Sequence, residues 1–137
     1  MRAGRGTVLG RRLRGSGANA VVEFALVLPI LLLLCLALVQ IGLLARDQLL
    51  LVQAARAGSR QAAVDPVDSA ARSAALDAAP GLDPERVEVT VVRTGGLGQP
   101  VEVTVGYGAR IAVPLAGLFF PSEVRLEAST AMRQEFP

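Results

Sequence analysis

The residues of this chain that could do chemistry are its serines and carboxylates, and their surroundings argue against catalysis. The chain has no histidine, so a serine such as Ser59 or Ser129 has no imidazole base to activate it. A metal site would lack histidine and exported cysteine ligands, because the single cysteine lies in an apolar run. Carboxylates such as Asp68 and Glu88 lie at a predicted helix end or on the solvent face of a predicted strand. We therefore expect no enzymatic activity, no cofactor, no metal site and no small-molecule substrate.

Glu23 is the carboxylate that invites a functional interpretation, because it directly precedes a long apolar segment. A charge at the centre of a membrane-spanning helix costs about 2.5–3.5 kcal/mol on insertion scales, and less near its edge. One interpretation is an interfacial charge that snorkels toward headgroups or interacts with the positive end of the helix dipole. The alternative is a role in contacts between helices.

The segment from Val22 to Ala45 is predicted to span a membrane as one helix. From Phe24 onward it is almost wholly apolar, and at about 1.5 Å per residue it reaches about 33 Å, enough for a hydrocarbon core of about 30 Å. The run is longer than the roughly 7–15 apolar residues of a cleaved secretory signal, so we expect it to remain attached. Cys35, in the middle of the span, is interpreted as a small hydrophobic residue.

The distribution of charge predicts the orientation of the span. Five of the 14 arginines precede the apolar run, without any acidic residue among them. The other nine are outnumbered by 12 acidic residues, so the part after the leader is formally −3 although the whole chain is +2. The positive-inside rule then predicts a single-pass protein of the cytoplasmic (inner) membrane, with its N-terminus in the cytoplasm and its C-terminal domain extracytoplasmic. A domain without a basic excess gives no support for nucleic-acid binding.

Composition and periodicity divide the chain into three parts. Residues 1–18 form a basic leader rich in Gly and Arg, which we expect to be disordered. Residues 19–64 are predicted to be one helix, which crosses the membrane and continues as an amphipathic helix with Leu49, Val52 and Ala55 or Arg56 on its apolar stripe. Pro66 ends this helix near Asp65.

Residues 65–137 are predicted to form an extracytoplasmic α+β domain. A second helix is expected from Val67 or Asp68 to Ala79, with Asp68 as its cap and Pro80-Gly81 at its end. The period then changes to two: Val-Glu-Val-Thr-Val occurs at 87–91 and again at 101–105, and the Gly-rich segment 94–100 between them indicates a hairpin. A third strand is predicted from Val124 to Gln134. The expected fold is thus a long N-terminal transmembrane helix, a short second helix and a small antiparallel sheet of about three strands, which the extracytoplasmic part of the long helix covers.

The apolar segment Leu115 to Phe120 lies between two prolines before the third strand. With the two prolines the segment has eight residues, which are too few to cross a membrane. The segment is interpreted either as a loop that packs on the sheet or as a patch that contacts a membrane or a partner.

The start of the span resembles the processing region of type IVb pilin-like proteins, in particular the TadE-like family of pilus-assembly pseudopilins. The resemblance rests on a small residue at the cut, then Glu23-Phe24, then an apolar helix with an early proline, Pro29. The segment from Ala55 to Arg60 is similar to the Ala-Arg-x-Gly-x-Arg element that these proteins carry after the span. The strand-rich C-terminal part is also similar, so the resemblance covers about residues 15–135.

The resemblance implies that a prepilin peptidase removes the leader, and two positions of the cut fit. Cleavage between Ala18 and Asn19 makes Glu23 the fifth residue of the mature chain, with Ala in place of the usual Gly before the cut. Cleavage after Gly17 keeps the Gly and makes Glu23 the sixth residue. We favour the first, because a slip of one residue turns Glu23 by about 100° around the helix from the new α-ammonium group.

The resulting hypothesis is a minor pilin or pseudopilin of a Tad-type (type IVb) pilus or secretion system that acts in pilus assembly. Its helix, with Pro29 as a kink and with Gly42, Ala37 and Ala45 as small residues, would pack against other helices. Expected partners are the lipid bilayer, a prepilin peptidase and other pilin-like subunits, including one similar to TadF. The alternative is an unprocessed bitopic anchor that presents a small partner-binding domain.

Overall fold

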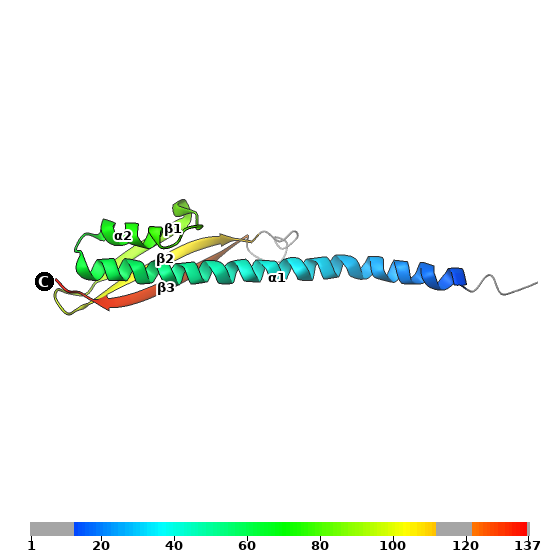
Figure 1. Ribbon diagram of the computed structural model, residues 1–137, viewed down its shortest axis with the longest axis horizontal. Helices are drawn as coiled ribbons and strands as arrows, with labels where there is room; N and C mark the ends of the chain where they lie inside the picture. Colours follow the sequence, from blue (N-terminus) through cyan, green and yellow to red (C-terminus); the bar gives the residue numbers. More distant parts are fainter. Residues whose placement is uncertain (1–12, 112–121, 137) are drawn as a thin grey trace, which may run out of the picture. The chain divides into compact units, whose positions relative to one another are not determined.

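The computed structural model describes residues 13–111 and 122–136 and confirms the predicted α+β fold (Figure 1). The elements in chain order are α1 (Leu13–Val64), α2 (Asp68–Asp77), the 3-10 turn η1 (Pro84–Arg86), β1 (Val87–Arg93), β2 (Pro100–Arg110) and β3 (Glu123–Arg133). The chain divides into two compact units, residues 1–38 and 39–137. The predicted apolar loop Leu115 to Phe120 lies outside the described residues, so its role stays open.

Helix α1 has 52 residues and begins earlier than predicted. It starts at Leu13, so the expectation of a disordered leader is wrong for residues 13–18, although residues 1–12 lie outside the described part. Gly15 and Gly17 are poor helix formers. An established helix nevertheless gains one hydrogen bond for each further residue that becomes ordered. The helix of the apolar run can therefore extend toward the N-terminus through both glycines. The C-terminal end at Val64, two residues before Pro66, is as predicted.

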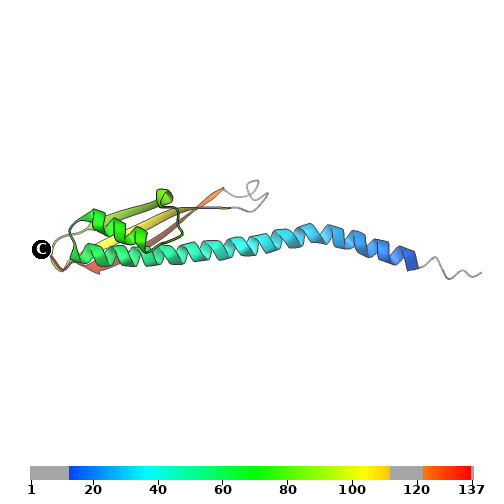
Figure 2. The same cartoon turned by 45° about the horizontal axis from the view of Figure 1, so that its top comes forward.

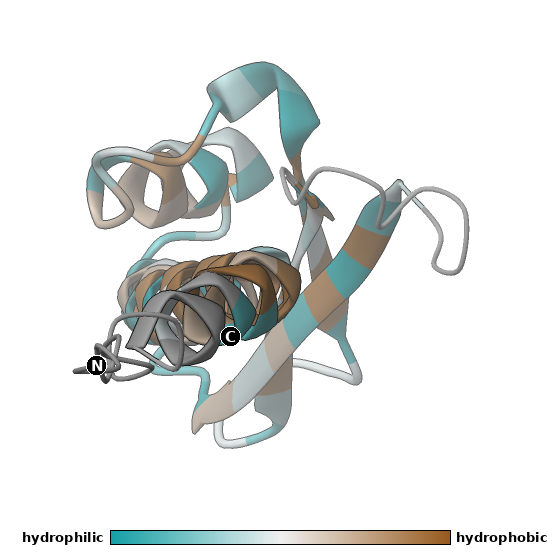
Figure 3. Ribbon diagram, turned by 90° about the vertical axis from the view of Figure 1, so that its right-hand side faces the viewer, coloured by the Kyte–Doolittle hydropathy of each residue, from teal (hydrophilic) through white to brown (hydrophobic). Residues whose placement is uncertain are grey.

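The three strands form an antiparallel sheet in the order β1-β2-β3. The two Val-Glu-Val-Thr-Val segments pair with each other, with Val89 opposite Val105, Thr90 opposite Thr104 and Val91 opposite Val103. On the other side of β2, Val105 lies opposite Ala128 of β3. Figure 3 shows the alternation of hydrophobic and hydrophilic residues along β3, which gives the sheet one apolar face.

The part of α1 beyond residue 50 covers this apolar face, as predicted (Figure 2). The predicted stripe is partly wrong, because Leu49 is 65% exposed and the Arg56 side chain is also exposed. The buried side chains of α1 in this core are small except for one leucine: Leu51, Ala54, Ala55, Ala62 and Ala63. Ala55 is buried as predicted, whereas Leu51 and Ala54 lie one position before the predicted Val52 and Ala55. The buried residues pack with Val89, Val101, Val103, Val105 and Ala128 of the sheet.

Helix α2 packs against α1 and β1, and its contact with α1 depends on Gly58. A Cβ atom at Gly58 would lie 3.0 Å from Cγ1 of Val103 and 3.2 Å from both the Ala71 carbonyl oxygen and Cβ of Ala75. Residues of α1, α2 and β2 thus meet at a position where any side chain larger than that of glycine would force its neighbours to shift.

Asp68 does not cap α2, contrary to the prediction. The residue at the N-cap is Val67, which makes no side-chain cap hydrogen bond, and Asp68 lies in the first turn. The Asp68 carboxylate instead accepts a hydrogen bond from Arg93 at 2.8 Å. Arg93 reaches this position because the last carbonyl groups of α1 attract the same guanidinium.

The C-terminal segment ties the hairpin turn to α1. Gln134 is buried, and its side-chain amide donates to the carbonyl oxygens of Gly95 and Gly96 in the turn. Its backbone exchanges hydrogen bonds with Gln99 and Gly98, each of 2.9 Å. The next amide, that of Glu135, donates to the Ala63 carbonyl oxygen at 2.8 Å.

Candidate functional site

The segment of α1 that was predicted to span a membrane is exposed over most of its length, and Gln40 is its one buried residue. Within Asn19–Val64 the helix has a stretch that is long and apolar enough to cross a bilayer. Every side chain from residue 19 to residue 36 is exposed, and Leu26 and Ile30 are each 68% exposed. So much uncovered apolar surface is unfavourable in water, which indicates that this helix anchors the protein in a membrane.

Glu23 stands alone in this apolar surface. It is the only charged residue between Arg14 and Arg46, and its side chain is exposed. Phe24 beside it is 62% exposed, so neither side chain has a packing role within the unit of residues 1–38. An exposed carboxylate at the edge of an apolar helix is available for a cation that comes from outside this chain.

The predicted processing residues Gly17, Ala18 and Asn19 all lie in α1, between about one and two turns before Glu23. Gly17 and Asn19 are exposed. Asn19 and Glu23 are separated by four residues, so they lie on the same face of the helix. Cleavage at either predicted position requires the first turns of α1 to unwind, and helix ends open readily. The position of the cut stays a prediction.

Two further predicted features of the span have a clear structural setting. The helix continues through Pro29, which has no amide hydrogen to donate to the carbonyl group of Ala25. The predicted kink stays a prediction. A Cβ atom at Gly42 would meet no atom within 4 Å, so the helix surface there is open to a close neighbour.

The segment Ala55 to Arg60 has two different faces. Ala55, Gly58 and Ser59 are buried, and the Ser59 hydroxyl donates to the Arg56 carbonyl oxygen at 3.1 Å. Arg56 and Arg60 are exposed and lie one turn apart. Sequence reasoning identified this segment by resemblance but missed the packing role of Gly58. The row of small residues at spacings of three and four could have indicated it.

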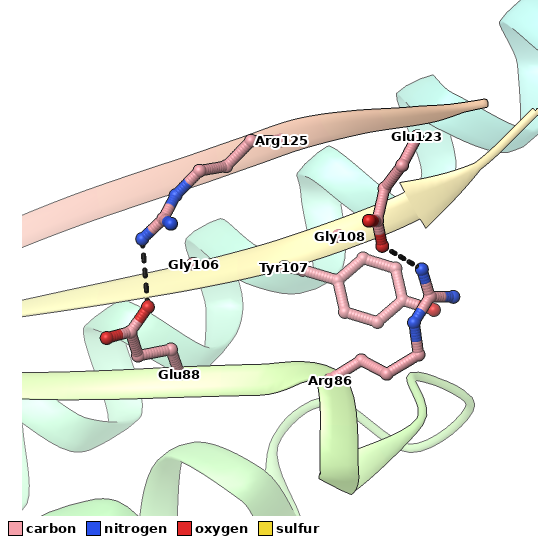
Figure 4. A pocket seen from close by; sticks show the side chains of 7 residues that line it. All are labelled: Arg86, Glu88, Gly106, Tyr107, Gly108, Glu123 and Arg125. Atoms are coloured by element: carbon pink, nitrogen blue, oxygen red, sulfur yellow. Dashed lines mark hydrogen bonds and ion pairs between the residues drawn. The ribbon is translucent and has the colours of Figure 1, made fainter. Parts of the chain in front are cut away.

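A polar hollow of about 260 Å³ lies over β2, a feature that sequence reasoning missed (Figure 4). Arg125 of β3 reaches across the strand to Glu88 of β1 at 2.9 Å, and Arg86 reaches Glu123 in the same way. Gly106 and Gly108 leave the space for these side chains, and two glycines within one strand could have signalled a close approach. The charged groups in the hollow neutralise one another, and none of them is a nucleophile with an adjacent base. Within residues 13–111 and 122–136 there is no group of three His, Cys, Asp or Glu side chains that could hold a metal ion.

Comparison with known protein families gives a match that lies entirely within α1. Residues 19–60 match the family model of TadE-like proteins. The matched segment begins at Asn19 and includes Glu23, Phe24, Pro29 and the segment from Ala55 to Arg60, so the resemblance inferred from the sequence is confirmed over residues 19–60. No curated protein and no solved structure matches the chain.

Proposed function

We propose that this protein is a minor pilin or pseudopilin that acts in the assembly of a Tad-type (type IVb) pilus or secretion system. The observation that carries the proposal is the position of the family match. It covers the exposed apolar helix with its single carboxylate and ends in the part of α1 that packs on the sheet. The part of the chain that resembles TadE-like proteins is therefore the part with the largest uncovered apolar surface.

The proposed mechanism begins with insertion of the span and removal of the leader by a prepilin peptidase. Cleavage before Asn19 would free an α-ammonium group on the same helix face as Glu23. In an assembly of parallel helices, the ammonium group of one subunit and the Glu23 carboxylate of a neighbour can then form an ion pair. In a low-dielectric environment such a pair is strong, and either charge alone is costly.

The rest of the span would supply the contact surface between subunits. An exposed apolar helix can leave lipid for a bundle of similar helices with little change in its surroundings. The open surface at Gly42 allows such helices to approach closely. The partners in this proposal are the bilayer, the peptidase and other pilin-like subunits, with a TadF-like protein among them. The domain would lie on the extracytoplasmic side of the inner membrane, and the protein would have no catalytic activity of its own.

Determination of the mature N-terminus tests the proposal. The full chain is expressed with and without a prepilin peptidase, recovered from the membrane, and analysed by N-terminal sequencing and intact mass. We expect Asn19 as the first residue in the presence of the peptidase and Met1 in its absence. Ala18 as the first residue would establish the other cleavage position. An unchanged N-terminus in both samples would contradict the proposal and favour an unprocessed bitopic anchor.

A further inference from the structure

A groove with three arginines runs between the end of α1 and the end of β3. Two adjoining hollows of about 440 and 410 Å³ share Arg60 and Met132, so they form one continuous depression. We call it the basic groove. Its cations are Arg56, Arg60 and Arg133, its apolar lining includes Ala57, Val64 and Met132, and Glu135 is its one carboxylate.

The arginines of the basic groove differ from the other arginines of the domain in their partners. Elsewhere, Arg46, Arg86, Arg93 and Arg125 form ion pairs, and Arg72 donates to the Val89 carbonyl oxygen. Arg56, Arg60 and Arg133 have no hydrogen-bond or ion-pair partner for their guanidinium groups among the residues that the structure describes. With Met132 36% exposed, the groove combines unneutralised positive charge with uncovered apolar surface. These properties suit a ligand that is acidic and partly apolar.

The turn that links α2 to β1 in the same domain has a surface that is both acidic and partly apolar. Its three carboxylates, Asp77, Asp83 and Glu85, are exposed and form no ion pair with any described residue. The exposed Pro80 and Pro84 lie between them and add apolar surface. We call this surface the acidic turn.

Two arginines beside the acidic turn pair with carboxylates outside it. Arg46, which lies beside Gly81, pairs with Asp47 at 3.7 Å. Arg86 pairs with Glu123, and only 18% of its side chain is exposed. One oxygen of Asp83 accepts a hydrogen bond from the Glu85 amide at 3.2 Å, and its other oxygen and the carboxylates of Asp77 and Glu85 are available to a partner.

The two surfaces lie on different sides of the domain and at different levels. Figure 1 shows α2 on one side of α1 and the C-terminal end of β3 on the other. Gly81 lies beside the Arg46 side chain, whereas the basic groove begins at Arg56. Ten residues along a helix correspond to about 15 Å.

We propose that the basic groove binds the acidic turn of a second copy of this chain. Because the two surfaces differ, each copy keeps one of them free for a further copy. Such a heterologous contact, with a stagger of about 15 Å along α1, extends into an open helical array instead of closing a dimer. The contact is made by the domain and does not involve cleavage or Glu23. The test of this contact and the test of the proposed role in pilus assembly can therefore give different results.

A membrane surface is the competing ligand for three arginines, and the spacing along α1 argues against it. Arg56 and Arg60 lie 11 and 15 residues beyond Ala45, which corresponds to about 16–22 Å along the helix. The headgroup layer on one side of a bilayer is only about 5–8 Å thick. A protein partner fits this position better.

Cross-linking of two differently tagged full-length chains tests the proposal. Both carry Cys35→Ser, so that each introduced cysteine is unique. One carries Ala57→Cys in the basic groove and the other Ala78→Cys beside Asp77. Both introduced positions are half-buried.

The chains are mixed in detergent and treated with a short bis-maleimide. We expect a cross-linked product from the mixture and little from either chain alone. Equal cross-linking of the Ala57→Cys chain with itself, or no product from the mixture, would overturn the proposal.

Charge reversal makes the test specific. Arg56→Glu with Arg60→Glu in the groove chain should lower the yield about ten-fold, and 0.5 M salt should also lower it. Combining this chain with one that carries Asp83→Arg and Glu85→Arg should restore the product. Arg125→Glu, on the exposed face of the sheet, is the matched control and should leave the yield unchanged. Tyr107 fluorescence verifies that each variant is folded.

The membrane alternative gives a different result. In proteoliposomes with anionic lipid, headgroup binding would protect the Ala57→Cys thiol from a soluble maleimide when no second chain is present. Protection that depends on anionic lipid, without cross-linking in the mixture, would overturn the contact between copies. If anionic lipid gives no such protection, the charge-reversal experiment decides the question: rescue supports the contact between copies, and failure of the rescue contradicts it.

Discussion

The guanidinium group of Arg93, the last residue of β1, donates a hydrogen bond of 2.9 Å to the carbonyl oxygen of Ala62 in the last turn of α1. The same group reaches the carbonyl oxygens of Asp65 and Pro66, each at 3.3 Å, and the Asp68 carboxylate. One side chain thus satisfies the end of α1, the connection to α2 and the first turn of α2. The positive charge also lies where the α1 dipole is negative, which favours this arrangement.

Replacement of Arg93 should therefore destabilise the whole domain. We expect Arg93→Ala to lower its free energy of unfolding by about 1–3 kcal/mol, because the partly buried carbonyl oxygens of Ala62 and Asp65 lose their donor. Urea unfolding of the full chain in detergent can be followed by the fluorescence of Tyr107, since the chain has no tryptophan and no other tyrosine. Arg125→Ala removes an ion pair between two largely exposed side chains and should cost much less. Equal effects of the two substitutions would contradict the role assigned to Arg93.

Gly58 tests the packing of α1 against α2 and β2. Gly58→Val should destabilise the domain by about 1–3 kcal/mol or more, because its side chain enters space occupied by Val103, Ala71 and Ala75. Gly42→Ala is the matched control in the same helix, where the added methyl group meets nothing. There the better helix propensity of Ala should leave the domain unchanged or slightly more stable. The same unfolding measurement compares the two, and a tolerated Gly58→Val would refute the predicted close contact.

Ala18 tests the preferred position of the cut. Ala18→Asp should block removal of the leader by the prepilin peptidase, because a small residue before the cut is replaced by a charged one. Ala18→Gly, which restores the residue usual at this position in the family, should be cut at least as well as the original chain. Electrophoretic mobility and N-terminal sequencing of the membrane fraction give the result. Normal cleavage of the Ala18→Asp chain would show that the cut lies elsewhere.

Glu23 separates processing from assembly. Glu23→Ala should leave cleavage intact and reduce incorporation of the protein into pilus-associated complexes, because the α-ammonium group of the neighbouring subunit loses its counter-ion. Glu23→Asp keeps the charge on a shorter side chain, so part of the incorporation into pilus-associated complexes should remain. The measurement is the fraction of mature protein that co-purifies with other pilin-like subunits. If Glu23→Ala assembles normally, the carboxylate is only an interfacial charge.

Local patterns were sufficient for most of the elements. The apolar run, Pro66 and the alternation in the two Val-Glu-Val-Thr-Val segments predicted the long helix, its end and the hairpin, all of which the structure confirms. These features depend on hydrogen bonds and side-chain periods within a few residues, which are readable from the chain itself. The start of α1 was missed because its glycines favour disorder locally, whereas the adjoining helix extends through them.

Tertiary packing decided which side chains of these elements are used. Leu49 and Leu51 are equally apolar, yet Leu51 is fully buried and Leu49 is 65% exposed, because the position of the sheet selects one face of α1. Asp68 serves Arg93 instead of capping α2, through a contact across 25 residues of sequence. The basic groove also joins residues that are more than 70 positions apart.

The sequence by itself determined the membrane segment, the lone carboxylate at its edge and the order of helices and strands, because these follow from composition and local spacing. Only the tertiary structure decided the buried face of α1, the contacts of Arg93 and which arginines have no partner among the described residues. Those depend on how distant segments pack, and the free-energy differences between competing side-chain partners are only about 1 kcal/mol each.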